Sequence, residues 1–362
     1  MENVQDVVDV NRVDGVDYVD LIDNMRAPRQ MYVRENYFES LDEQKFFERF
    51  RLTKNTTLYL LNKIEEQLEY EHNRNNSIAP IDQLLLTLRT FATGGHLLSI
   101  ADFIQADKST ISRLVTKVTH VIASLANEFI YMPRNQLEVK DCQNKFYDVC
   151  RFPRVIGAID GTHIRIQSPG GVDAEVFRNR KGYFSINVQI CINADFLIQD
   201  IVARWPGSAH DATIFNNSRL KFRFQEGEFG NGILLGDSGY MNTHYLMTPF
   251  LNTTARGQEN YNRAHVRTRV KVENVIGIWK RRFPILAYGC RLKLESILPI
   301  IVATAVLHNV ARLQGEPEPP NENNVNEHEL QQAIVNGDIP IGGQENNQHD
   351  DRLHFVQNYF NN

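Results

Sequence analysis

The chain has 362 residues, of which 42% are hydrophobic and 23% charged, as in a soluble globular protein with one large or two ordinary domains. No apolar run approaches the ~20 residues of a membrane span, and the first residues lack the basic start and apolar stretch of a secretory signal. Four widely separated cysteines, none in a C-x-x-C pair, argue against a zinc ribbon or a disulfide framework and suit a reducing compartment.

The net charge of −5 is distributed unevenly along the chain. Residues 1–25 hold seven acids against Arg12, and residues 314–362 hold nine acids against Arg352. The body between them is basic, with 37 Lys and Arg against 28 Asp and Glu over residues 26–313. A basic body favours binding to a nucleic-acid backbone, because Lys and Arg neutralise phosphates. Acidic tails that only aid solubility are the alternative interpretation of the same charges.

The first half of the chain is predicted to be helical. Residues 1–27 alternate Val with Asp and are expected to form a flexible acidic arm or a weakly ordered strand. Over residues 28–149 apolar side chains recur at helical spacing, which predicts an all-helical domain. One of its helices is expected to begin at Pro80 and to end at Gly94. The residues expected to share the buried face of another helix are Leu58, Leu61, Ile64 and Leu68.

A helix-turn-helix is predicted within this domain. A short helix over 99–105 is followed by a turn and by a second helix over 109–127, which is the arrangement that places one helix in a DNA major groove. Helix pairs of this kind also occur in proteins that never touch DNA, so both readings stay open. The basic side chains that the second helix would present to DNA are Lys108, Arg113 and Lys117.

The second half of the chain, residues 150–313, is predicted to be an α/β domain, because short β-branched runs alternate with helical segments. The predicted strands are 154–160, 185–194, 196–205 and 232–237, and the predicted helices are 210–218, 261–283 and 295–313. Residues 314–362 form an acidic tail, which we expect to be disordered over 314–348 because that part is polar and rich in Pro and Asn. Its last residues, 350–360, regain apolar character and are expected to dock back onto the body.

Two predicted strands each end in an aspartate beside a glycine. Asp160 ends RVIGAID and precedes Gly161, which is expected to turn the backbone, and Asp237 ends GILLGD. Ligands of open α/β sheets bind at such strand ends, so two aspartates on adjacent strands could hold one cation. Taken singly, an Asp after a strand is more often a turn former or a helix cap.

A third acid lies in the predicted helix 261–283. Glu273 adjoins a buried stripe and is the only acid between Tyr261 and Lys293, so it is either neutralised by basic neighbours or reserved for a metal. Three carboxylates from two strands and a helix can hold Mg²⁺ or Mn²⁺, which take oxygen ligands and support phosphoryl transfer. Zinc is disfavoured, because Cys and multi-His ligation are missing. The stripe consists of Val272, Ile276, Trp279 and Phe283.

With these residues in place, the sequence resembles the Harbinger-type transposase superfamily and its domesticated, transposase-derived nucleases. The matching segments, in order, are GAIDGTHIRI, FRNRKGYFSINVQ, PGSAHDATIFNNS, LLGDSGYMNTHYLMTPF and RVKVENVIGIWKRRFPIL. The resemblance implies a ribonuclease H-like fold with an acidic triad at Asp160, Asp237 and Glu273. It also makes Asp211, from the HD of PGSAHD, a possible fourth metal ligand, although an N-cap of the helix that begins near 212 explains this residue equally well. Asn274 stands where the family would place a basic residue.

Basic and imidazole side chains surround these acids in the sequence. The run Arg178, Arg180 and Lys181 is predicted to grip the DNA backbone, since Arg and Lys position duplexes by phosphate contacts. Arg281 and Arg282 are predicted to extend the same basic face, and a solvated surface is the alternative for all five. The histidines nearest to the acids, which could orient water or phosphate or simply be structural, are His163 and His210.

The resemblance implies a metal-dependent DNA nuclease that hydrolyses phosphodiester bonds. One alternative is an active transposase that performs strand transfer with the same site, and another is a catalytically lapsed DNA-binding or scaffold protein. The lapsed reading is disfavoured, because clustered carboxylates repel one another without a cation. The resemblance further implies a separate Myb-like partner, and the lack of a membrane-length apolar run leads us to expect no membrane association. Without a compact Lys/Arg run typical of a strong nuclear signal, we expect the protein in both nucleus and cytoplasm, and its oligomeric state cannot be read from the sequence.

Overall fold

The computed structural model describes residues 35–70, 77–94, 107–289, 292–319 and 350–360, without the side chain of Cys150. The described residues from Tyr37 onward form one compact unit. The predicted acidic arm, the short helix over 99–105 and residues 320–348 of the predicted disordered tail lie outside the described residues.

The part of the chain before the sheet is helical, as the spacing of its apolar residues predicts. Its helices are α2 (Tyr37–Ser40), α3 (Glu43–Phe50), α4 (Lys54–Leu68), α5 (Pro80–Thr93), α7 (Lys108–Ser124), α8 (Ala126–Phe129) and α9 (Gln136–Cys150). Pro80 is the first residue of α5, and Gly94 ends that helix at a φ of 78°. In α4 the buried face includes Leu60, which has 0% exposure, whereas Leu58 is 40% exposed and was wrongly predicted to be buried. The reason is that Leu60 lies four residues before Ile64 and so shares its face.

Five strands form one mixed sheet in the order β3-β2-β1-β4-β5. They are β1 (Val155–Arg165), β2 (Ser185–Ile192), β3 (Ile198–Pro206), β4 (Ile233–Leu235) and β5 (Leu246–Met247), with η1 (Val172–Phe177), α10 (Asp211–Asn216) and α11 (Arg219–Gln225) in the connections. The central strand β1 pairs antiparallel with β2 and parallel with β4. A mixed sheet with helices confirms the predicted α/β class.

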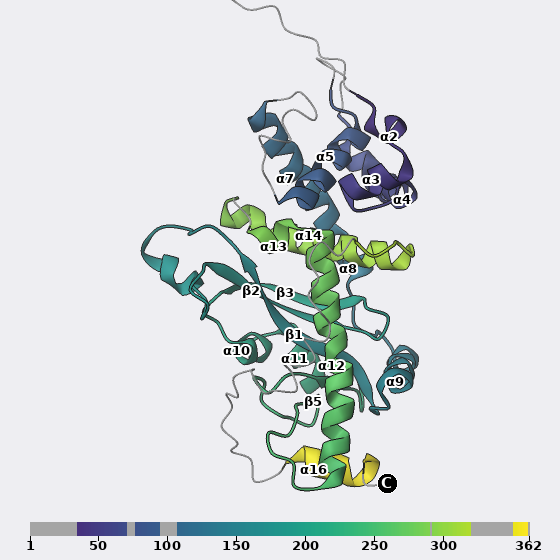
Figure 1. Ribbon diagram of the computed structural model, residues 1–362, viewed down its shortest axis with the longest axis vertical. Coiled ribbons are helices and arrows are strands. Elements are labelled where there is room, and N and C mark those ends of the chain that lie inside the picture. The colour runs from purple at the N-terminus through teal and green to yellow at the C-terminus, as the bar shows by residue number, and fades with distance from the viewer. Residues whose placement is uncertain (1–34, 71–76, 95–106, 290–291, 320–349, 361–362) are drawn as a thin grey trace, which may run out of the picture. The chain divides into compact units, whose positions relative to one another are not determined.

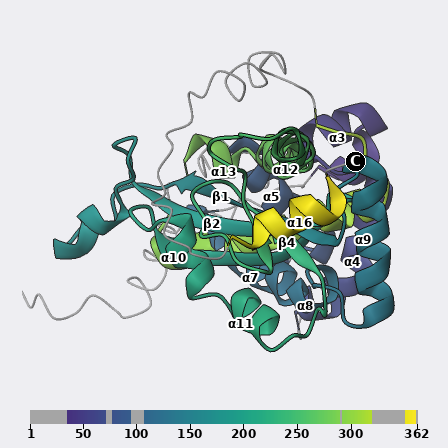
Figure 2. The same cartoon turned by 90° about the horizontal axis from the view of Figure 1, so that it is seen from below.

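The last helices are α12 (Arg256–Arg282), α13 (Ile285–Tyr288), α14 (Leu294–Leu313) and α16 (Asp351–Tyr359). Figure 1 shows α12 running across the sheet, and Figure 2 shows it end-on beside α13. Side chains of α12 and α14, including Val272 and Val306, pack in one core with Ala158 of β1. A second core joins Ile159, the next residue of β1, to Phe215 of α10. Because neighbouring residues of a strand point to opposite faces, α12 and α10 cover opposite faces of β1.

Helix α14 is the core helix of the unit. By length and hydropathy alone it is the one described helix that could cross a membrane, which corrects the expectation that no stretch of the chain is long and apolar enough, but 67% of it is buried within the protein. Its Asn309 donates hydrogen bonds to the backbone oxygens of Phe129 and Ile198 at 2.7 Å each. The helix therefore joins the N-terminal helices to strand β3, and its hydrophobicity is explained by burial.

Helix α16 confirms the expectation that residues 350–360 dock on the body. Its buried residues Phe355, Val356 and Phe360 join a core with Phe152 and Tyr261. The rings of Phe355 and Phe152 stack with centroids 5.5 Å apart. In Figure 1 this helix lies against one end of α12, where Asn260 of α12 donates to the backbone oxygen of Phe360.

The structure corrects one detail of the predicted strands. Strand β1 does not end at Asp160 but continues to Arg165, and Gly161 pairs with Gln189 of β2 inside the regular ladder. No turn is therefore made there. Helix α9 lies at the predicted boundary near residue 149 and packs on β1 and α12.

Candidate active site

Asp160 and Asp237 lie level with each other on neighbouring parallel strands. In the register of β1 and β4, Ala158 is the partner of Leu235. Asp160 follows the first of these by two residues, and Asp237 follows the second by two. Since adjacent strands are about 4.8 Å apart, the two aspartates emerge side by side where β4 ends and β1 continues alone on that edge. The predicted adjacency of the two strands is confirmed, although Asp160 lies within β1 and Asp237 follows β4 by two residues.

Glu273 approaches the same place from helix α12. Asp160 shares the face of β1 that carries Ala158 and Thr162, because side chains alternate along a strand. Lys280 of α12 donates a hydrogen bond to Thr162 Oγ1 at 2.6 Å, which fixes α12 over this face. A second bond runs from Lys280 Nζ to the backbone oxygen of His163 at 3.0 Å. The helix that carries Glu273 is therefore pinned to the strand segment just after Asp160.

Asp211 reaches β1 from the opposite face. A β-carbon at Gly161 would collide with the Asp211 carboxylate, and residue 161 points away from the face of Asp160. Asn187 Nδ2 donates to Asp211 Oδ1 at 2.7 Å and holds the carboxylate there. Asp211 is the first residue of α10, and the N-cap position belongs to His210. The alternative interpretation of Asp211 as an N-cap residue is therefore wrong.

The four acids form one electrostatic unit centred on Asp160. The pKa of the Asp160 carboxyl is raised to about 7, chiefly by burial and also by the charges of Asp237, Asp211 and Glu273, while the guanidinium of Arg269 opposes the rise. Burial also raises the pKa of Asp211, while its hydrogen bond from Asn187 opposes that rise. In both cases burial is the main cause, because a carboxylate that has lost its water is harder to ionise, and the charges of neighbouring acids add to the rise.

One cation of the protein itself already lies within this unit. Arg269 and Glu273 are one helical turn apart on α12, and Arg269 Nη2 is 2.6 Å from Glu273 Oε1. Their side chains are only 17% and 20% exposed, so the pair is shielded from solvent. Neutralisation of Glu273 by a basic neighbour, one of the two readings of the sequence, is thus what the structure contains.

The donor set fits a hard divalent cation. Each acid accepts a hydrogen bond through only one of its two carboxylate oxygens. Asp160 Oδ1 accepts from the Gly161 amide and Asp237 Oδ1 from the Gly239 amide, both at 2.9 Å. Asp211 accepts from Asn187, and Glu273 from Arg269. Among the described residues no hydrogen bond reaches the second oxygen of any of the four. Oxygen atoms of carboxylates are the ligands that Mg²⁺ and Mn²⁺ prefer.

These side chains are near one another without yet forming a closed ligand cage. Within the described part of the chain, no three Asp, Glu, His or Cys side chains are arranged to hold a metal ion as they stand. One carboxylate oxygen of Glu273 is engaged in the ion pair with Arg269. A ligand set would therefore form by rotation of side chains, with the backbone already in register.

Of the three basic residues before β2, Arg180 acts on one of the acids and Lys181 on a neighbouring histidine. Arg180 is exposed and in contact with His210, and its charge acts on Asp211. Lys181 is also exposed, and its charge acts on His163. Arg178 instead holds the connection between η1 and β2, because it forms an ion pair with Glu175 at 2.7 Å and donates to the Gly182 oxygen at 2.8 Å.

The predicted basic face after Glu273 is only partly at the surface. Arg282 is 1% exposed, and its guanidinium donates to the backbone oxygens of Arg51 and Pro317 at 2.8 and 2.7 Å. Its buried position removes it from the predicted DNA contacts, because it joins α12 to the N-terminal helices instead. Arg281 is half-buried. The residue that sequence reasoning missed between them and Glu273 is Lys280.

Helix α7 presents its predicted DNA-reading residues in different ways. Lys108 and Arg113 are exposed. Lys117 is half-buried, since its Nζ donates to the Leu68 oxygen at 3.1 Å and lies over the ring of Tyr70.

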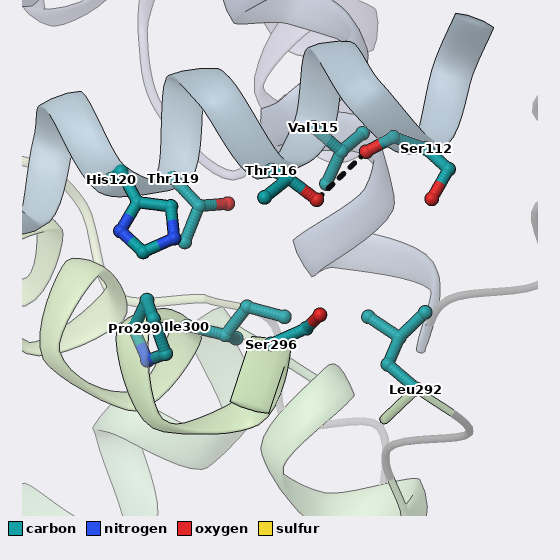
Figure 3. A pocket seen from close by; sticks show the side chains of 9 residues that line it. All are labelled: Ser112, Val115, Thr116, Thr119, His120, Leu292, Ser296, Pro299 and Ile300. Carbon is teal, nitrogen blue, oxygen red and sulfur yellow. Dashed lines mark hydrogen bonds between the residues drawn. The ribbon is translucent and has the colours of Figure 1, made fainter. Parts of the chain in front are cut away.

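On another side of α7, an open hollow lies beside its contact with α14. Figure 3 shows His120 of α7 facing Pro299 of α14 across this hollow, which lies apart from the acids.

The unpredicted residues of the site are those that hold the acids. Asn187 fixes Asp211, Lys280 fixes α12 on β1, and Arg269 pairs with Glu273. A sequence signal for two of them existed, because Arg269, Glu273 and Lys280 are spaced by four and seven residues and so share one helix face. No pattern within β2 distinguishes Asn187.

Comparisons with known proteins find relatives for the part of the chain that contains the four acids. Residues 159–309 match the family described as DDE superfamily endonuclease. The chain is 29% identical over 260 residues to the protein named "Putative nuclease HARBI1" of Rattus norvegicus, a match that covers 71% of this chain and 74% of the relative. The protein of the same name from Homo sapiens is 28% identical over the same shares of both chains. "Protein ALP1-like" of Arabidopsis thaliana is 24% identical over 77% of this chain and 73% of its own. Among solved structures no significant match is found.

Proposed function

We propose that this chain, which carries a DDE superfamily endonuclease domain and is a homologue of the Harbinger transposase-derived protein HARBI1, is a metal-dependent DNA nuclease that hydrolyses phosphodiester bonds. The observation that carries the proposal is the convergence of carboxylates from β1, the segment after β4, and α12 on the surroundings of Asp160. A fold has no need to gather mutually repelling acids unless a cation joins them.

In this proposal Asp160, Asp237 and Glu273 hold the metal. The aspartates lie level on adjacent strands, and Glu273 comes from the helix that covers the same face of β1. Divalent cations bound there would activate a water for attack and stabilise the leaving oxygen of the phosphodiester. Asp211 approaches β1 from the other face, so we assign it an outer position in which it supports the site electrostatically.

The DNA would lie along the exposed basic residues beside the acids. Arg180 and Lys181 are exposed on the connection that leads into β2, and their charges act on Asp211 and His163 respectively. Side chains of this kind bind phosphate oxygens and fix the position of a duplex. The excess of Lys and Arg over residues 26–313 supplies a long-range attraction for the same polyanion.

A ribonuclease H-like fold is part of this proposal. Three antiparallel strands followed by two parallel ones, with the first acid on the central strand and the last on a covering helix, support it. We also propose that the helices before the sheet, α7 among them, assist in DNA binding through Lys108 and Arg113, which are exposed. Two further proposals are a separate Myb-like partner, which the family resemblance implies, and a distribution between nucleus and cytoplasm.

The test is metal-dependent nicking of plasmid DNA by the purified full chain. We expect nicking with Mg²⁺ or Mn²⁺, none in EDTA, and a loss of about 100-fold or more in Asp160→Asn and in Glu273→Gln, because each removes a ligand charge. Asp148→Asn, an exposed aspartate on α9, is the matched control and should cut like the parent. Circular dichroism and thermal unfolding establish that the variants are folded.

Nicking that survives in Asp160→Asn and Glu273→Gln would refute the assignment of the site. The transposase alternative is separated in the same assay by adding oligonucleotides with free 3′ hydroxyl ends. A hydrolytic nuclease yields only nicked plasmid, whereas strand transfer joins the oligonucleotide covalently to the plasmid.

A further inference from the structure

Arg269 is placed where a metal ion would be expected to act. It lies one turn before Glu273 on α12 and pairs with Glu273 Oε1 at 2.6 Å. Its charge is also the positive charge that acts most strongly on Asp160. A single guanidinium therefore offsets the two acids that come from different elements, the strand and the helix.

The surroundings of Arg269 show that it is held in place by these acids rather than by a full set of hydrogen bonds. Its side chain is 17% exposed, and its buried Nε atom has no hydrogen-bond partner in the part of the chain that the structure describes. An unpaired buried N–H group is unfavourable, by roughly 1–3 kcal/mol in typical cases. Arg269 therefore occupies its position because the carboxylates attract it, and that attraction disappears once another cation neutralises them.

We propose that Arg269 is a built-in counter-ion that neutralises Glu273 and Asp160 before metal binds, and that the metal displaces it from Glu273. This inference rests on the proposed function, since it assigns a role to a residue that the catalytic ligand set does not include. Arg269 is a positioning residue in this account. It acts through Glu273 and contacts neither the metal nor DNA.

The exchange requires little movement of the protein. Arg269 and Glu273 belong to the same helix, so a change of rotamer in two side chains separates them while α12 stays pinned to β1 through Lys280 and Thr162. Glu273 Oε1 cannot serve a guanidinium and a closely bound divalent ion at once, because two cations so near to each other repel. Metal binding is therefore in competition with Arg269.

The competition predicts an unusual effect of substitution. In Arg269→Gln the acids lose their internal counter-ion, so the metal-free protein should be less stable, with an unfolding midpoint in EDTA lowered by about 2 °C or more. The same variant should bind Mn²⁺ more tightly than the parent, with a dissociation constant roughly tenfold smaller, because no cation has to be displaced. Arg269→Lys keeps the charge and should lie between the two.

The measurement is a titration of the full chain with Mn²⁺ by isothermal calorimetry, together with thermal unfolding in EDTA and in Mn²⁺. Arg267→Gln, which removes an exposed arginine from the same helix, is the matched control and should behave like the parent. If Arg269 only supports the fold, Arg269→Gln will lose the same stability with and without Mn²⁺, and its affinity will be unchanged or weaker. Either result overturns the inference.

The same titration distinguishes this inference from the proposed function. If the parent binds Mn²⁺ and Glu273→Gln weakens that binding, the metal site stands, and the behaviour of Arg269→Gln decides the role of Arg269 alone. If the parent binds no Mn²⁺, both ideas fall together. If Arg269→Gln is too unstable to titrate, Arg269→Lys carries the test, because its affinity should still exceed that of the parent.

Discussion

Gly161 leaves room on one face of β1 for the Asp211 carboxylate, while its neighbour Asp160 projects from the opposite face. Asp160 lies on the α12 side of β1, and Asp211 lies against the backbone of Gly161 on the α10 side. The backbone φ of Gly161 is not positive. A glycine is therefore needed here for the space that a missing side chain leaves and not for an unusual backbone conformation. Glycine within a strand often marks such a close approach.

Gly161→Ala should therefore disturb Asp211 and not the course of β1. The added methyl group collides with the Asp211 carboxylate and should lower the free energy of unfolding by about 1–3 kcal/mol. Chemical denaturation of Gly161→Ala, Asp211→Ala and the double variant measures this coupling. We expect the double variant to be more stable than the sum of the two single effects predicts, because Asp211→Ala removes the colliding group.

Gly277→Ala is the control for this series. A β-carbon there meets only the terminal Nη1 of the Arg281 side chain, at 3.3 Å, and alanine favours a helix. Strictly additive losses for residues 161 and 211 would show that the two do not touch in solution.

At the same scale, the sequence could predict the acids and not the residues that hold them. Asp160, Asp237 and Glu273 stand out because each follows or interrupts a regular apolar pattern. Arg269 and Arg282 look alike in the sequence, yet one pairs with Glu273 and the other is buried against backbone oxygens of the N-terminal helices. Partners of a long, flexible cation depend on which elements pack against its helix, and local spacing does not contain that information.

Among the elements, those with a strong apolar period were predicted well and short ones were not. The structure confirms α14 within one residue of the predicted 295–313 and β2 within two of 185–194. Strand β5 has two residues and exists because it pairs with β4. Among the described side chains of helix α9 only Val139 and Phe146 are buried, so its amphipathic pattern is weak.

Helix α16 is an element whose docking makes a testable contribution to stability. Phe355 is 3% exposed and packs on Phe152, and Arg352 donates to the Pro249 oxygen at 3.0 Å. Asn242, in the segment between β4 and β5 that also contains Asp237, donates to Asp350 Oδ1 at 3.4 Å, so the start of α16 contacts the loop that carries a proposed metal ligand.

Phe355→Ala should lower the free energy of unfolding by about 3–5 kcal/mol, because it removes a buried aromatic ring and leaves a cavity. Leu353→Ala changes a residue of the same helix that is 46% exposed, and should cost far less. Denaturant unfolding of both variants provides the comparison. Equal and small losses in the two variants would mean that α16 is not docked in solution.

For the molecule as a whole, buried neutral histidines link stability to pH. Burial lowers the pKa of His308 to about 4, and the charges of Arg282 and Arg312 act in the same direction. Its Nε2 donates to the Phe196 oxygen at 3.0 Å, while its buried Nδ1 has no partner among the described residues. Protonation of Nδ1 would therefore place an unpaired charge inside the core.

The sign of the effect follows from this lowered pKa. Between pH 6.5 and about 4 the unfolded chain binds a proton at His308 that the folded chain does not, so stability falls as the pH falls through this window. A shift of this size corresponds to roughly 3 kcal/mol at most. His308→Gln keeps a donor for the Phe196 oxygen and should show a flatter loss of stability over that range.

His354→Gln, which changes an exposed histidine of α16, is the control and should keep the slope of the parent. Stability is measured by denaturant unfolding at several pH values in EDTA, so that metal binding does not contribute. An unchanged slope in His308→Gln would contradict a neutral, buried His308.

Charge and domain organisation also belong to the whole molecule. The basic body and acidic ends were readable from composition, and they bear on DNA binding and not on the fold. The boundary predicted near residue 149 reflects a real change from helices to strands, yet the described residues from Tyr37 onward form one compact unit. Contacts such as those of Arg282 with Arg51 and Pro317 join the two parts, and they link residues too far apart in sequence to be predicted.

The account depends most directly on a cation binding between strands β1 and β4. Anomalous diffraction from crystals soaked in Mn²⁺ locates that ion without reference to activity. We predict a peak contacting carboxylate oxygens of both Asp160 and Asp237, with Glu273 turned toward it and away from Arg269. A peak elsewhere, or none at a concentration that saturates binding in solution, would contradict the account.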